Sequence, residues 1–138
     1  MGQLLRQRAA VGALPDLRPR LGDATTVSRP GSEGADWGIH ACSDAGRGCF
    51  DESVLTDATG GESLRRYPPR PGDVLVADRG YAHLDALAAI GAVPAHFVVR
   101  VSWNRFAFRT AAGEGWDLLK SGAGDACVAR ARVEPGGG

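Results

Sequence analysis

The sequence predicts a layered domain of the α/β or α+β class. Its first half contains segments in which apolar and polar residues alternate with a period of two, which is typical of half-buried strands. Its second half contains an apolar run, a segment with a helical apolar stripe, and another apolar run. Antiparallel strands followed by a β-α-β unit favour a sheet with helices packed on it. The 138 residues are enough for one domain with a modest core.

The antiparallel part is predicted in the first half of the chain. Trp37 and Ile39 alternate with smaller or polar residues, and a second alternating segment follows a glycine-rich turn. In that second segment Phe50 and Val54 are expected on one face, because residues an even number apart along a strand share a face. The expected elements are a strand at residues 21–27, a loop at 28–36, a strand at 37–42, a turn at 43–48 and a strand at 49–56.

The β-α-β part is predicted from residue 74 onward. An uninterrupted apolar run at 74–77 indicates a strand that is buried on both faces. Residues 84–91 have apolar positions three and four apart, so they predict a helix that ends at Gly91. Residues 97–101 predict a further strand, and residues 62–67 could form a short helix.

Composition excludes some classes of protein and leaves others open. The 16 basic and 16 acidic residues give a net charge of zero, which neither favours nor excludes nucleic acid as a partner. No apolar stretch is long enough to cross a bilayer and no secretion signal is present, so a cytoplasmic protein without a membrane segment is expected. Cys42, Cys49 and Cys127 have neither disulfide-framework nor zinc-site spacing, and reduced thiols are expected.

Two aspartates are candidates for chemistry because of where they lie. Asp23 is inside or at the end of the first predicted strand, and Asp78 follows the most apolar strand. If these strands are neighbours, the two carboxylates could hold a hard divalent ion such as Mg²⁺ and support phosphodiester chemistry. The alternative is structural, since an aspartate after a strand often caps a turn, here through Gly80.

The two aspartates belong to blocks that occur in a fixed order. The blocks are DATTV at 23–27, PGS at 30–32, DW at 36–37, IH at 39–40, LTDA at 55–58, GESL at 61–64, DVLVADRGY at 73–81 and FVVRV at 97–101. In this order they resemble the DDE transposases of bacterial insertion sequences, the type-four group, whose second aspartate stands in a DRGY motif. The resemblance covers roughly residues 20 to 110.

The resemblance implies a fold, a cofactor and a partner. The fold would be ribonuclease H-like, a mixed sheet with flanking helices. Asp23 and Asp78 would be the first two catalytic carboxylates and ligands of Mg²⁺ or Mn²⁺, and the partner would be DNA at transposon ends and target sites. DNA phosphates could be contacted by Arg79, Arg100 and Arg105, although a structural role is the first expectation for Arg79. A hydrogen-bonded strand histidine is expected for His40, and an interaction with a helix start is expected for Glu62.

The sequence also departs from the family pattern. The third carboxylate of the family, a glutamate in a Tyr-Arg-Glu-Lys-type signature, has no counterpart, because the later Glu114 and Glu134 lack those neighbours. Gly22 and Gly38 replace larger residues of the pattern, and a glycine inside a strand is expected to leave a hole in the packing.

A truncated transposase, inactive alone, is therefore expected. A non-catalytic remnant or a DNA-binding or partner-binding fragment is the alternative. The expected organisation is an N-terminal lead-in at residues 1–20, a partial catalytic core at 21–110 that is incomplete at its C-terminal side, and a glycine-rich, disordered tail at 111–138. A sheet without its full set of helices would expose an apolar face, so self-association is expected.

Overall fold

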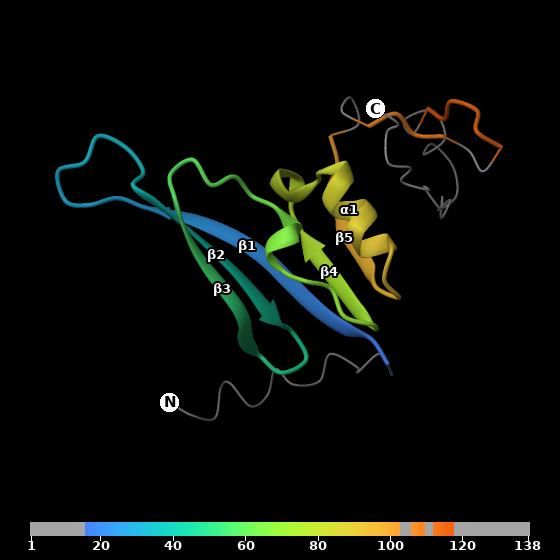
Figure 1. Ribbon diagram of the computed structural model, residues 1–138, viewed down its shortest axis with the longest axis horizontal. Coiled ribbons are helices and arrows are strands. Elements are labelled where there is room, and N and C mark those ends of the chain that lie inside the picture. The colour runs from blue at the N-terminus through green and yellow to red at the C-terminus, as the bar shows by residue number, and fades with distance from the viewer. Residues whose placement is uncertain (1–15, 103–105, 110–111, 118–138) are drawn as a thin grey trace.

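The described part of the chain folds around a mixed five-stranded sheet. The computed structural model describes residues 16–102, 106–109 and 112–117. The strand order is β3-β2-β1-β4-β5 (Figure 1). The pairs β3–β2 and β2–β1 are antiparallel, and the pairs β1–β4 and β4–β5 are parallel. The strands are β1 (Arg18–Val27), β2 (Trp37–Asp44), β3 (Cys49–Asp57), β4 (Asp73–Ala77) and β5 (His96–Val99). This sheet with its helices confirms the predicted α/β class and is consistent with a ribonuclease H-like fold.

The described helices lie on one face of the sheet, here called the covered face. Side chains of η2 (Leu64–Arg66), η3 (Arg79–Tyr81) and α1 (Leu84–Gly91) share one core with Leu75 of β4 and Cys42 of β2. On the opposite, open face, Val74 and Val76 are only half-buried. The prediction that residues 74–77 are buried on both faces was therefore wrong for the described part of the chain, because these helices all pack against one side.

The predicted hairpin is present, but its second strand contains a β-bulge. The register shifts between Cys42 and Ser43, which leaves Asp51 of β3 without a directly opposed partner. The extra residue turns Phe50 to the open face, where it is 77% exposed. Val54 stays on the covered face opposite His40. The expectation that Phe50 and Val54 share a face was wrong, because a bulge reverses the alternation.

Other boundaries differ from the predictions by a few residues. β1 begins at Arg18 rather than at residue 21, and β2 extends to Asp44. The short helix predicted at 62–67 is a single 3₁₀ turn, η2, and the last strand ends at Val99 rather than at residue 101. The predicted helix at 84–91 is confirmed as α1.

Gly22 and Gly38 leave no holes in the packing. A β-carbon at residue 22 would lie 2.9 Å from Cε2 of Tyr67, so the tyrosine ring occupies that space. A β-carbon at residue 38 would lie 2.8 Å from the Thr56 hydroxyl and 3.1 Å from His40 Nε2. The expectation of packing defects was wrong, because residues distant in sequence fill both positions.

A buried ion network joins β1 to β3 and β4. Arg20 is 0% and Asp73 1% exposed, with 3.1 Å between Nη1 and Oδ2. Arg20 Nη2 lies 2.7 Å from Asp51 Oδ2 at the bulge, and Arg18 Nε lies 2.7 Å from Asp73 Oδ1. Burial alone would raise the pKa of the Asp73 carboxyl, but hydrogen bonds from Arg18, a backbone amide and Arg20 hold this pKa below its ordinary value.

The open face carries apolar side chains from several strands. Strand alternation and the pairing register place Leu21, Ile39, Leu55 and Val98 on this face, and they are 44%, 37%, 67% and 59% exposed. Among the described residues, no helix combines the length and the apolar character needed to span a membrane.

Residues 106–117 form a small turn structure where they are described. The Trp116 amide donates to the Phe108 carbonyl at 2.9 Å, and the two rings meet edge to face with centroids 6.3 Å apart. The rest of the predicted tail, together with Arg105 and Cys127, lies outside the described residues.

Candidate active site

Asp23 lies in β1, and Asp78 directly follows β4, the neighbouring parallel strand. The last pair of the β1–β4 register is Gly22 with Ala77, and Asp23 and Asp78 are the residues that directly follow them. Neighbouring strands lie ~4.8 Å apart. Asp23 is exposed, and strand alternation points it to the open face, opposite to the buried Gly22. Asp78 has extended backbone angles, φ −83° and ψ −173°, and is also exposed.

Asp78 also has the structural role that the sequence left open. It is the N-cap of η3, and its Oδ1 accepts a hydrogen bond from the Gly80 amide at 2.8 Å. Asp23 behaves similarly, since its Oδ1 accepts from the Ala24 amide at 2.8 Å. Each of these bonds uses one carboxylate oxygen. Within the described part of the chain, the second oxygen of each aspartate has no hydrogen-bonded partner, so each leaves an oxygen for a ligand.

Glu62 lies beside Asp78, which sequence reasoning did not anticipate. A β-carbon at residue 80 would overlap Oε2 of Glu62 and would lie 3.3 Å from Oδ1 of Asp78. Both carboxylates therefore surround the bare backbone of Gly80. The expectation that Glu62 acts on a helix start was wrong, because η2 begins at Leu64 and is capped by Ser63.

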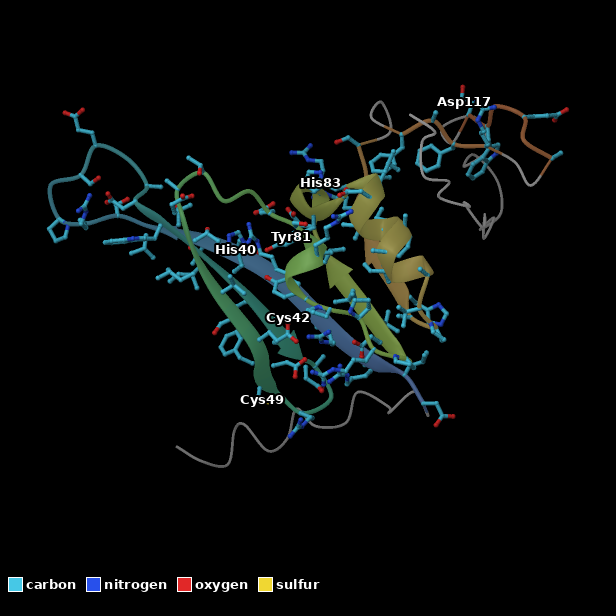
Figure 2. All side chains as sticks on the ribbon, viewed as in Figure 1. His40, Cys42, Cys49, Tyr81, His83 and Asp117 are labelled. Atoms are coloured by element: carbon cyan, nitrogen blue, oxygen red, sulfur yellow. The ribbon has the colours of Figure 1, made fainter. Side chains whose placement is uncertain are left out.

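Two buried tyrosines lie behind the aspartates on the covered face. Tyr67 and Tyr81 are both 0% exposed, and their hydroxyl oxygens are 3.5 Å apart. Tyr67 donates to the backbone carbonyl of Asp23 at 3.4 Å. In Figure 2, Tyr81 lies next to the arrowhead that marks the carboxyl end of β4. Burial raises the pKa of both phenols, and the nearby Asp23 carboxylate adds to both shifts, so both phenols stay protonated.

His40 is a buried, hydrogen-bonded strand histidine, as predicted. It is 2% exposed, and its Nε2 lies 3.1 Å from the Thr56 hydroxyl. Burial, followed by the positive charge of Arg66, lowers the pKa of His40 below its ordinary value. A neutral imidazole held by a threonine is a structural element of the β2–β3 pair.

The three arginines proposed for DNA differ in their placement. Arg79 is exposed in η3, next to Asp78. Arg100 is exposed directly after β5, and Arg105 lies outside the described residues. Of the two arginines that the structure describes, Arg79 directly follows Asp78 in the chain, and Arg100 follows Val99, which pairs with Ala77.

The donor set suits a hard divalent ion with few protein ligands. Within residues 16–102, 106–109 and 112–117, no three His, Cys, Asp or Glu side chains converge as a complete metal site. Mg²⁺ is often held by one or two carboxylates together with water and substrate phosphate. Asp23 and Asp78, each with an oxygen not used in capping, fit that pattern.

Comparison with known proteins gives matches among curated sequences. One is the InsL protein of insertion sequence element IS186A from Escherichia coli strain K12, which is named a transposase, and another is the transposase of insertion sequence element IS421 from Escherichia coli. Each is 33% identical to this chain over 119 residues, which are 85% of this chain.

The chain is similar to insertion-sequence transposases. It spans 32% of the length of these relatives. No protein-family model matches the chain, and no solved structure gives a significant match.

Proposed function

We propose that this chain is part of the catalytic core of a DDE transposase, with a ribonuclease H-like sheet that carries Asp23 and Asp78 as metal-binding carboxylates. The observation that supports this most is the parallel β1–β4 register, whose last pair, Gly22 and Ala77, consists of the residues that directly precede the two acids. The similarity to insertion-sequence transposases points to DNA as the substrate.

The proposed chemistry is divided between the cation and the chain. When bound, Mg²⁺ or Mn²⁺ would activate a water or a 3′-hydroxyl and stabilise the leaving oxygen of a phosphodiester. Asp23 and Asp78 would hold this cation through the carboxylate oxygens that accept no hydrogen bond from the backbone. Arg79, exposed beside Asp78, would bind a DNA phosphate in a bidentate manner.

Metal titration tests this proposal. Mn²⁺ binding would be measured by calorimetry on the wild-type chain and on Asp23→Asn and Asp78→Asn. Both substitutions keep Oδ1 as a cap acceptor, so the backbone is retained while a negative charge is removed. We expect weak, saturable binding by the wild type and loss of saturation in both variants.

Asp85→Asn is the matched control for these variants. It removes the same charge from α1, where Asp85 pairs with Arg65 on the surface at 3.0 Å, and it should bind Mn²⁺ like the wild type. If the wild type shows no saturable binding, or if all three variants behave alike, Asp23 and Asp78 do not form a metal site.

A further inference from the structure

We infer that Tyr67 and Tyr81 form a clasp that sets the spacing between Asp23 and Asp78. The two tyrosines are positioning residues, since neither is proposed to touch metal or DNA. The inference rests on the proposed function only as far as it concerns metal affinity.

The clasp lies where the pairing between β1 and β4 ends, one residue before each aspartate. The last paired positions of β1 and β4 are Gly22 and Ala77. Asp78 follows as the cap of η3, while β1 continues along β2 to Val27. The β1–β4 ladder therefore does not fix the distance from Asp78 to Asp23 directly, and other contacts have to do so.

Tyr67 contacts β1 at this point in two ways. Its ring lies against Gly22, where a β-carbon would approach Cε2 to 2.9 Å and Cδ2 to 3.3 Å. Its hydroxyl donates to the carbonyl of Asp23 at 3.4 Å. The absence of a side chain at residue 22 thus lets the ring reach the backbone of the residue that carries the first carboxylate.

Tyr81 lies against the Tyr67 ring as well. It is the last residue of η3, the turn that Asp78 caps, so its position is tied to that of Asp78. Its ring centroid lies 6.2 Å from that of Tyr67, and the two hydroxyl oxygens are 3.5 Å apart. Because the Tyr67 proton is used on Asp23, Tyr81 is the donor in this pair. The contacts run from η3 through both phenols to the backbone of Asp23.

Burial gives these long hydrogen bonds their importance. Both tyrosines are 0% exposed, so neither hydroxyl can replace its protein partner with a water molecule unless the core opens. A buried phenol normally keeps a hydrogen-bond partner for this reason. Removing one hydroxyl should leave the packing of the rings intact and release only the connection between η3 and β1.

Amide hydrogen exchange of the full chain, measured by NMR, tests the clasp without any metal. The reporters are the Ala24 amide, which donates to Asp23, and the Gly80 amide, which donates to Asp78. In Tyr67→Phe we expect both amides to exchange about threefold to tenfold faster, as for loss of one net hydrogen bond. The Leu75 amide, within the paired part of β4, should not change. Unchanged reporters, or equal acceleration at Leu75, would overturn the clasp.

A glycine pair provides a second variant and its control. Gly22→Ala should displace the Tyr67 ring and accelerate both reporters at least as much as Tyr67→Phe. Gly61→Ala adds the same methyl group where no heavy atom lies within 4 Å, and it should leave both reporters unchanged. Equal effects of the two alanines would contradict a specific role of the ring.

Measuring Mn²⁺ affinity tests the clasp and the proposed metal site separately. If the wild type binds Mn²⁺, Tyr67→Phe should bind it about threefold to tenfold more weakly at a temperature where both proteins are folded. A wild type that does not bind Mn²⁺ would contradict the metal site, while the exchange data would still decide the clasp. Normal Mn²⁺ affinity in Tyr67→Phe would show that the clasp does not position the carboxylates.

Discussion

The carboxylate of Glu62 fills the space into which a β-carbon of residue 80 would project, next to Asp78. The glycine of the DRGY motif therefore has a steric role, because only a residue without a side chain lets Glu62 approach this closely. Glu62 is half-buried, and no ion pair to an arginine or lysine joins it within the described part of the chain. Two neighbouring carboxylates repel one another unless a cation lies close to both.

From this contact we predict that Glu62→Gln weakens Mn²⁺ binding without lowering stability. The charge beside Asp78 is removed, while the side chain keeps its volume in front of Gly80. Calorimetric titration and thermal unfolding would be compared with the wild type, with an expected change in unfolding free energy within about 0.5 kcal/mol. A large loss of stability with unchanged Mn²⁺ binding would instead assign Glu62 a structural role.

Stability should decrease at acidic pH through Asp73. The pKa of Asp73 is lower in the folded chain than its unfolded value of about 3.9, so the unfolded chain binds a proton at Asp73 more readily than the folded chain does. The resulting stabilisation is complete above the unfolded pKa and is lost as the pH falls through the lower folded pKa. Urea unfolding from pH 6 to pH 2.5 should show this decrease.

Replacing Asp73 should show the same interaction at neutral pH. Asp73→Ala leaves Arg20 buried with fewer anionic partners, and we expect a loss of about 3 kcal/mol at pH 7. Asp85→Ala, a surface position that pairs with Arg65, should lose less than about 1 kcal/mol. Comparable losses at the two positions would contradict a special role of the buried network.

His40 should make a separate contribution at milder pH. Its folded pKa is below the unfolded value of about 6.5, so the unfolded chain binds the proton more readily. The contribution of His40 to the free energy of unfolding is complete above pH 6.5 and decreases as the pH falls below this value. An NMR titration should show the depressed pKa directly, and His40→Gln should reduce the difference in unfolding free energy between pH 7.5 and pH 5.5. A His40 that titrates at or above 6.5 would contradict this prediction.

The open face should cause the purified chain to associate. Leu55 and Val98 are 67% and 59% exposed on this face, and exposed apolar surface promotes contacts between molecules. The double variant Leu55→Gln and Val98→Thr should shift light scattering towards the monomer. Leu84→Gln changes a side chain that is 50% exposed on α1, and it should not. A wild type that stays monomeric at high concentration would show that this surface does not promote association.

Local patterns predicted which elements form, since polarity alternation and apolar runs are properties of neighbouring residues. β2, β3, β4, α1 and β5 were all anticipated to within a few residues. The bulge at Asp51 was not, because it is stabilised by Arg20, which lies 31 positions away in the sequence. The packing of Gly22 was misjudged for a similar reason, since the Tyr67 ring that fills its space comes from η2's C-cap and not from a neighbour in the strand.

The sequence by itself determined that Asp23 and Asp78 each belong to a strand-associated block, and that the chain combines antiparallel strands with a β-α-β unit. Only the tertiary structure decided that the strands preceding or carrying these aspartates are adjacent and parallel, with Gly22 opposite Ala77, and that Glu62 and the two tyrosines gather around them. The reason is physical. Strand propensity and polarity act over a few residues, whereas the strand order and the burial that bring distant side chains together depend on how the whole chain packs.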